Sequence, residues 1–174
     1  MKESWEGEFQ HFIRNEDEAD LLWFTVEMVI KEAGKKELLA NPKILDIGGR
    51  QGEFSKFLNS KGIKAVSIDL LKVDHNQGAE QVQANIHKLP FQNESFNIIV
   101  ANSVFDDLLY KFNYSTVIKE IARVLEPNGI FIMLASAINS HKVPELSEYF
   151  SRIDTPFTKN LAFSEEEAIL WQKK

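Results

Sequence analysis

A glycine-rich turn between a buried strand and the start of a helix is the part of this sequence best suited to hold a small ligand. The apolar run 44–47 includes Asp46 and is followed by Gly48, Gly49 and Gly52. Glycine permits positive φ angles and lets the backbone approach a ligand closely, and the first N–H groups of the next helix are free to bind it. We expect these four residues to line a binding site, although the glycines would also suit a tight turn that binds nothing.

An acidic residue at the end of the next strand extends this site. A second apolar run, 65–68, ends in Asp69, which follows Asp46 by 23 positions. A carboxylate at the end of the second strand can accept hydrogen bonds from both hydroxyls of a ribose. Strand, glycine turn, helix, strand and acid together predict a nucleoside-binding βαβ unit. The alternative is an ordinary Asp that starts a loop.

Four segments in the correct order resemble one family. ILDIGGRQGEF followed by AVSIDL resembles the first two motifs of class I S-adenosylmethionine-dependent methyltransferases. QANIHKLPFQNESFNIIVANSVFDDL is similar to the third and fourth strand ends of that family, and RVLEPNGIFIML to its helix, turn and strand further on. The resemblance covers about residues 41–135. It implies a doubly wound α/β fold with a mostly parallel, seven-stranded, Rossmann-like sheet, with S-adenosylmethionine as methyl donor and S-adenosylhomocysteine as product.

The resemblance also assigns roles to residues at the strand ends. It implies that Leu70 and Ile86 flank the adenine, that the Asn85 side chain accepts a hydrogen bond from the adenine amino group, and that Asn102 lies under the methyl group. The family's middle turn glycine is replaced here by Arg50, and Asn85 stands where an Asp is frequent, so this contact carries no charge. The cofactor-binding residues expected are Asp46, Gly48, Gly49, Gly52, Asp69, Leu70, Asn85, Ile86 and Asn102.

Candidate catalytic bases follow the fourth and fifth strands. Methyl transfer from a sulfonium is an in-line displacement in which much of the catalysis is positioning, and a base is needed only if the acceptor must lose a proton. Asp106 and His141 are the candidates, with Asp107 and His87 as alternatives; each His would also suit an ordinary surface position. The His and carboxylate spacings match no metal-binding motif, so no metal is expected.

Composition narrows the acceptor. The chain has 174 residues, a net charge of −6 and no cysteine. An acidic protein is not attracted to phosphate backbones, and no apolar run is long enough to cross a bilayer. We expect a cytoplasmic enzyme that methylates an oxygen or nitrogen of a small molecule, with nucleic acid disfavoured as a substrate. The rivals are a catalytically degenerate fold with a binding or regulatory role, and a nicotinamide-dinucleotide enzyme.

The elements that position these residues form a single domain in three parts. Residues 1–40 are expected to form an N-terminal helical cap, 41–135 the cofactor-binding core, and 136–174 a closing helix and strand pair. Asn15 should cap a helix that runs to about Ala33 and buries Leu21, Phe24, Met28 and Val29. An aromatic stripe precedes it, and a protein partner or second copy could dock on this helix. The strands expected are 44–47, 65–68, 81–84, 96–101, 130–134, 152–157 and 167–172, with helices at 52–60, 116–125 and 144–150 and a tight turn at 127–129.

Overall fold

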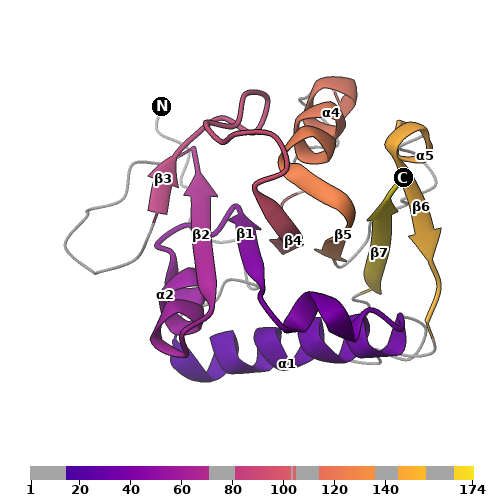
Figure 1. Cartoon of the computed structure of the whole chain (residues 1–174). Helices are drawn as coiled ribbons and strands as arrows, with labels where there is room; N and C mark the ends of the chain where they lie inside the picture. The colour runs from indigo at the N-terminus through magenta and orange to yellow at the C-terminus, as the bar shows by residue number, and fades with distance from the viewer. Residues whose placement is uncertain (1–14, 71–80, 103, 105–113, 136–144, 156–166) are drawn as a thin grey trace.

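The fold is a single seven-stranded sheet with helices on both faces (Figure 1). The computed structural model describes residues 15–70, 81–102, 104, 114–135, 145–155 and 167–174. The strand order is β3-β2-β1-β4-β5-β7-β6, and the first five strands in this order are mutually parallel. The strands are β1 (Lys43–Ile47), β2 (Lys64–Asp69), β3 (Gln81–Gln83), β4 (Phe96–Asn102), β5 (Leu125–Ala135), β6 (Phe150–Ile153) and β7 (Glu167–Lys173).

The antiparallel pair at the end of the sheet matches the expected closing strands. β7 runs antiparallel to β5, and β6 runs antiparallel to β7. A doubly wound, mostly parallel sheet of seven strands is therefore confirmed. The helices are α1 (Glu16–Glu32), α2 (Glu53–Ser60), α4 (Tyr114–Val124) and the short α5 (Leu146–Tyr149), with a 3-10 turn, η2 (Lys36–Leu39).

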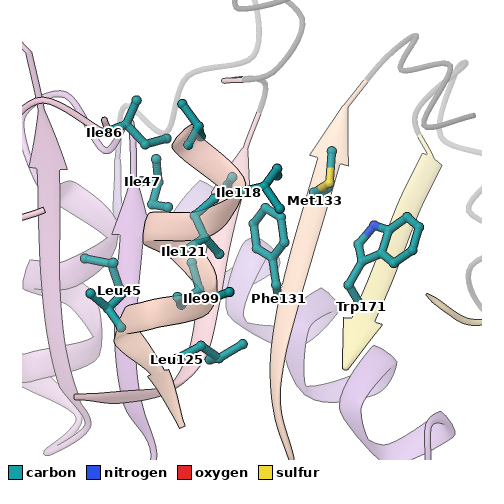
Figure 2. Close-up of a cluster of buried hydrophobic side chains, with 14 of the residues drawn as sticks. Leu45, Ile47, Ile86, Ile99, Ile118, Ile121, Leu125, Phe131, Met133 and Trp171 are labelled. Carbon is teal, nitrogen blue, oxygen red and sulfur yellow. The ribbon is translucent and has the colours of Figure 1, made fainter. Parts of the chain in front are cut away.

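Alternate residues of the central strands point to two separate cores. Leu45 and Ile47 of β1 face α4 and α5, where Ile118 and Ile121 of α4 pack over the sheet beside Phe131 (Figure 2). Ile44 faces the other way, toward α1 and α2. Because β1 and β4 are covered on both faces, their residues read as continuous apolar runs, and the one buried carboxylate in β1, Asp46, stands out.

The N-terminal helix begins as expected but turns a different face to the core. The Asn15 side chain accepts a hydrogen bond from the Glu18 backbone N–H, as an N-cap does. The expectation that Leu21 and Phe24 are buried is wrong, because they are 60% and 55% exposed, whereas Val29 is buried as expected and Met28 is half-buried. The sequence carries two apolar stripes on this helix, and periodicity alone does not choose between them. The buried stripe is Ala19, Leu22, Val26, Val29 and Ile30.

The expected turn at 127–129 is built into β5. Leu125 pairs with Phe96 and Ile130 pairs with Ile98, so residues 126–129 lie opposite Asn97 alone. Asn128 takes a left-handed φ of 62° in this excursion. The turn chemistry was therefore placed correctly, but it interrupts a strand rather than preceding one. The expected strand at 152–157 is instead Phe150–Ile153: it begins two residues earlier, Asp154 and Thr155 are not part of it, and positions 156 and 157 lie outside the described residues.

All five parallel strands end at the same edge of the sheet, where ligands of such folds bind. β1, β2, β3 and β4 bring the glycine turn, Asp69, the 84–88 segment and Asn102 to that edge. Within the described ranges, no helix has both the length and the apolar composition needed to traverse a bilayer.

Candidate functional site

The glycine turn, residues 48–52, is tied to the end of β2 by its own backbone. The N–H groups of Gly48 and Gly49 both donate to the Ile68 carbonyl, at 2.8 and 3.1 Å. The next N–H, that of Arg50, donates to Oδ2 of Asp69 at 3.0 Å. Three successive N–H groups therefore fix the turn against the neighbouring strand, and the turn ends at Gly52, the N-cap of α2.

Three residues of the turn have left-handed backbone angles. Gly48 has a φ of 77°, Arg50 of 45° and Gly52 of 74°. Such angles cost a non-glycine residue about 1–2 kcal/mol. Arg50 thus occupies a backbone conformation that glycine adopts without this cost, and its side chain is exposed. The arginine therefore adds strain to the turn.

Gly49 is needed for a different reason. A Cβ at this position would overlap Oδ2 of Asp46 and would lie 2.6 Å from Oγ of Ser67. At Gly48, a Cβ would overlap the side chain of Val104, which follows β4. The missing side chain at position 49 therefore makes room for residues beneath the turn, rather than for a ligand above it.

Asp46 is buried beneath the turn in a hydrogen bond with Ser67. Asp46 is 3% exposed and Ser67 is fully buried. The Ser67 hydroxyl donates to Oδ2 of Asp46 at 2.6 Å. Burial raises the pKa of Asp46 from 3.8 to about 6, the Ser67 hydrogen bond acts to lower it, and the charge of Asp69 adds to the rise. Asp46 therefore holds a proton to higher pH than an exposed aspartate does.

Asp69 and Leu70 lie where the sequence places them, at the end of β2. Asp69 is partly exposed, and its backbone carbonyl accepts from Ala84 N–H at 2.9 Å, which joins β2 to the segment after β3. Leu70 is 53% exposed, one of three large apolar side chains left open to solvent among the described residues. A partly exposed carboxylate beside an exposed apolar side chain suits a ribose and the face of a base.

The segment after β3 departs from the expected contacts. Oδ1 of Asn85 accepts from the His87 backbone N–H at 2.9 Å and lies 2.8 Å from Nδ1 of His87. An adenine amino group would therefore have to share this oxygen. Ile86 is 6% exposed and packs in the core beside α4, so its side chain faces inward. An adenine beside this segment would therefore meet the backbone of Ile86 rather than its side chain.

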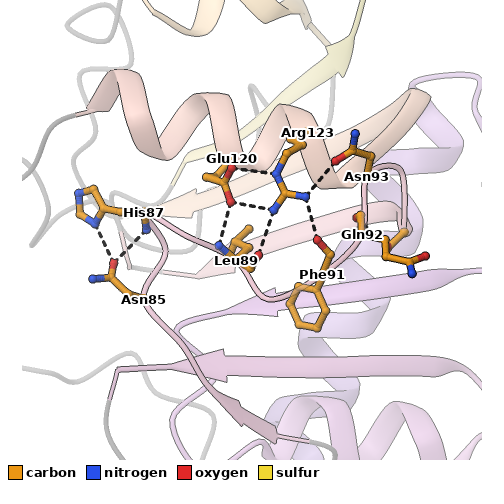
Figure 3. Close-up of polar contacts among 9 residues, drawn as sticks. Asn85, His87, Leu89, Phe91, Gln92, Asn93, Glu120 and Arg123 are labelled. Carbon is orange, nitrogen blue, oxygen red and sulfur yellow. Dashed lines mark hydrogen bonds and ion pairs between the residues drawn. The ribbon is translucent and has the colours of Figure 1, made fainter.

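A guanidinium from α4 holds the rest of this loop, residues 85–93 (Figure 3). Arg123 donates to the carbonyls of Leu89 and Phe91, at 3.0 and 2.8 Å, and to Oδ1 of Asn93 at 3.1 Å. Glu120 pairs with Arg123 at 2.8 Å and also accepts from Leu89 N–H at 2.8 Å. The hydrogen bond from Arg123 holds the pKa of Glu120 below its usual value. Helix α4 therefore fixes the loop that would flank a base.

The acceptor side of the site is described only at Asn102 and Val104. Asn102 ends β4, is partly buried, and pairs in register with Leu134 of β5. The candidate bases Asp106 and His141 lie outside the described residues, as does the aromatic stripe before Asn15, so their roles stay predictions. In the segments that the structure describes, no three His or acidic side chains converge as metal ligands do.

A family model described as "Methyltransferase domain" matches residues 45–133, which is half of the chain. The match contains the glycine turn, Asp69, the 85–93 loop and Asn102.

The chain belongs to the class I methyltransferase family.

Several curated relatives of this methyltransferase domain are longer proteins. It is 32% identical over 114 residues to an uncharacterized protein of Methanocaldococcus jannaschii, covering 65% of this chain and 44% of the relative. It is 24% identical over 148 residues to a glycine/sarcosine/dimethylglycine N-methyltransferase of Actinopolyspora halophila, with 77% and 26% covered. It is 30% identical over 126 residues to a probable tRNA methyltransferase 9B of Homo sapiens, with 68% and 26% covered. The chain thus spans less than half the length of these relatives.

Solved structures share the fold. A TehB-like S-adenosylmethionine-dependent methyltransferase of Corynebacterium glutamicum superposes with a TM-score of 0.64 at 19% identity, covering 91% of this chain and 98% of that one. A Burkholderia thailandensis 1,6-didemethyltoxoflavin N1-methyltransferase, solved with its substrate and S-adenosylhomocysteine, gives 0.58 at 19% identity, with 91% and 83% covered.

Two features of the methyltransferase domain were missed from sequence. Ser67 is the single polar residue in the run 65–68, two places before Asp69, and that polarity in a buried strand was the available signal. The Glu120–Arg123 spacing of three residues signals a helical ion pair, but nothing local indicates that Arg123 reaches a loop some 30 residues earlier.

Proposed function

We propose that this domain binds S-adenosylmethionine at the carboxyl edge of its sheet and transfers the methyl group to an oxygen or nitrogen of a small molecule. The observation that carries the proposal is the glycine turn. Its backbone is fixed to Ile68 and Asp69, so the turn, a buried acid and a ribose-type carboxylate converge at one strand edge.

Each part of the cofactor has a candidate partner. In this proposal Asp69 accepts from the ribose hydroxyls, Leu70 covers the adenine, and the backbone at Ile86 borders it. The Asp46 carboxylate lies beneath the turn, where its charge favours the cofactor's ammonium group. Asn102, at the end of β4, lies toward the methyl group. The sulfonium supplies the electrophilic methyl, and these residues orient it for in-line attack.

Charge favours a small acceptor over nucleic acid. The net charge of −6 provides no general attraction to a phosphate backbone. The relatives include enzymes named for both kinds of substrate: the glycine/sarcosine/dimethylglycine N-methyltransferase and the tRNA methyltransferase already described. An RNA acceptor is therefore the alternative that an acceptor screen must include.

The proposal is tested first by thermal unfolding with S-adenosylmethionine, S-adenosylhomocysteine and NAD in parallel. A ligand at about 100 times its dissociation constant adds roughly 2.7 kcal/mol, which raises the melting temperature of a chain this size by roughly 5–10 °C. We expect a rise with the first two ligands and none with NAD. No rise with either S-adenosylmethionine or S-adenosylhomocysteine would contradict the proposal and favour a degenerate fold.

The matched variants are Asp69→Asn and Asp69→Ala. The amide introduced by Asp69→Asn keeps an oxygen that can accept from Arg50 N–H, so the turn is retained, but the charge that binds the ribose is lost. We expect Asp69→Asn to weaken binding with little change in melting temperature, whereas Asp69→Ala should lower both. A loss of binding only when the turn is also destabilised would mean that Asp69 has a structural role alone.

A further inference from the structure

A short row of polar side chains crosses the sheet, and two of its members, Asp46 and Ser67, lie beneath the glycine turn. The strand register places Gln81 of β3, Ser67 of β2 and Asp46 of β1 side by side, and the row continues as Val100 of β4 and Ile132 of β5. The row is therefore polar on β1, β2 and β3 and apolar on β4 and β5. A buried carboxylate is costly unless other groups hold it, so the role of its partner needs an explanation.

The packing of the turn depends on the pair formed by Asp46 and Ser67. Their oxygens are 2.6 Å apart, and both side chains lie against the backbone of Gly49, where a Cβ would strike them. Ser67 is fully buried, so it cannot meet a ligand itself. The Ser67 hydroxyl can therefore affect a bound ligand only through the Asp46 carboxylate, to which it donates.

The surrounding charges do not favour an ionised Asp46. The strands beside β1 are β2 and β4, and α1 and α2 pack on the face of the sheet to which Asp46 belongs. None of the ionisable residues of α1 is buried. β4 carries no ionisable residue, and the charge of Asp69 on β2 opposes ionisation. Burial opposes it more strongly, whereas the Ser67 hydrogen bond acts in its favour. The other ionisable residues on the turn and on α2 are exposed or partly exposed: Arg50, Glu53 and Lys56.

We propose that Ser67 is a positioning residue of the cofactor site, whose hydroxyl orients the Asp46 carboxylate under the turn and keeps it charged for the cofactor's ammonium group. The inference rests on the proposed function. It has a specific consequence: capture of the amino-acid end of the cofactor is linked to a proton on Asp46, whereas capture of the nucleoside end is not.

The first test needs no ligand. The Asp46 carboxyl carbon is followed by NMR from about pH 4 to pH 9 in the wild type, Ser67→Ala and Ser55→Ala. Ser55 is the matched control, because it is also fully buried but its hydroxyl donates to the Gly52 carbonyl at 3.0 Å and not to Asp46. We expect a higher titration midpoint in Ser67→Ala only. An unchanged midpoint in that variant would overturn the coupling.

The second test compares two ligands by calorimetry over the same pH range. S-adenosylhomocysteine carries the amino group, and 5′-methylthioadenosine has the nucleoside without it. At pH 6.5, Ser67→Ala should bind S-adenosylhomocysteine about three- to tenfold more weakly than the wild type, with a smaller deficit at pH 9, because a tenfold change corresponds to one pH unit of the midpoint. Binding of 5′-methylthioadenosine should be unchanged.

A double variant separates positioning from structural damage. Ser67→Ala should have no further effect on S-adenosylhomocysteine binding in an Asp46→Asn background, which has no charge to hold. An equal loss for both ligands, or an undiminished loss in that background, would overturn the proposal. If the wild type binds neither ligand at any pH, the proposed function fails, and the ligand-free titration still decides whether Ser67 controls Asp46.

Discussion

The glycine turn and the 85–93 loop border the same candidate ligand position, but they are held in different ways. The turn is fixed by its own N–H groups against the adjacent strand, over a buried acid with no room for another atom. The loop is fixed from a distance, by the Arg123 guanidinium on α4 (Figure 3). The turn should therefore be sensitive to added volume, and the loop to the loss of one hydrogen-bonding side chain.

The largest effect is expected from Gly49→Ala. The added Cβ overlaps Oδ2 of Asp46 and crowds Ser67, and hydrogen bonds to Ile68 and Asp69 hold the turn backbone in place above them. We expect a loss of about 3 kcal/mol in the free energy of unfolding and loss of S-adenosylhomocysteine binding. The measurement is denaturant unfolding with calorimetry.

Gly62→Ala is the control for that change. Gly62 has a φ of 79°, and a Cβ added there would meet no other atom within 4 Å, so the substitution adds only backbone strain of about 1 kcal/mol. An equal loss at both positions would show that volume beneath the turn is not the deciding factor.

The second prediction concerns the loop. Arg123→Met removes the donors to the carbonyls of Leu89 and Phe91 and removes the ion pair with Glu120, which keeps only its hydrogen bond from the Leu89 N–H. We expect a loss of about 2 kcal/mol in stability and weaker binding of S-adenosylhomocysteine and 5′-methylthioadenosine by similar factors, because the loop borders the nucleoside. Arg123→Lys should restore little, since an ammonium cannot span these acceptors. A defect confined to S-adenosylhomocysteine would break the comparison.

The third prediction concerns Asp46, beneath the turn, and expects that replacing it raises stability. The pKa of Asp46 is raised to about 6 in the folded state from 3.8, so the native state binds more protons between these values. The contribution of Asp46 to the free energy of unfolding therefore falls as the pH rises from about 4 to 6, and it stays low above pH 6. Asp46→Asn should raise the free energy of unfolding at pH 7 by about 1–2 kcal/mol, with the gain vanishing near pH 4. Thermal unfolding across that pH range measures it, and a variant less stable than wild type at pH 7 would contradict the sign.

The smallest effect is expected at Arg50. Its φ of 45° is strained for any residue with a Cβ, and its side chain is exposed. Arg50→Gly should raise stability by about 1 kcal/mol or less without loss of cofactor binding, as seen by thermal unfolding with and without S-adenosylhomocysteine. A marked loss of binding would assign the Arg50 side chain a direct role with the ligand.

What the sequence revealed about the fold was mostly local. The turn, the strand that ends in Asp69, and the buried run 96–101 were predictable because glycine spacing and apolar runs are read within a dozen residues. The stripe of α1 that is buried was not, since Leu21 and Phe24 fit helical periodicity as well as Leu22 and Val26 do. The choice depends on what packs against the helix.

The same limit applies to the site. Asp46 and Asp69 were identified because each ends or interrupts an apolar strand. The reach of Arg123 to Phe91 depends on three-dimensional proximity, which no local pattern contains. The hydrogen bond from the His87 N–H to Asn85 spans only two residues and is of the Asx-turn type, so a local pattern could have indicated it. Gly49 lies in the glycine turn as expected, but the structure gives it a different task from close approach to a ligand.

The crowding beneath Gly49 also has an evolutionary consequence. A Cβ at position 49 would overlap Oδ2 of Asp46 as well as crowd Ser67, so a smaller residue at position 67 alone would not make room for it. Among relatives that keep the acid at position 46, position 49 should therefore remain glycine. Larger residues at position 49 should occur only where the acid at position 46 is also replaced, and the family's sequence record would then show covariation between a strand residue and a turn residue three positions apart.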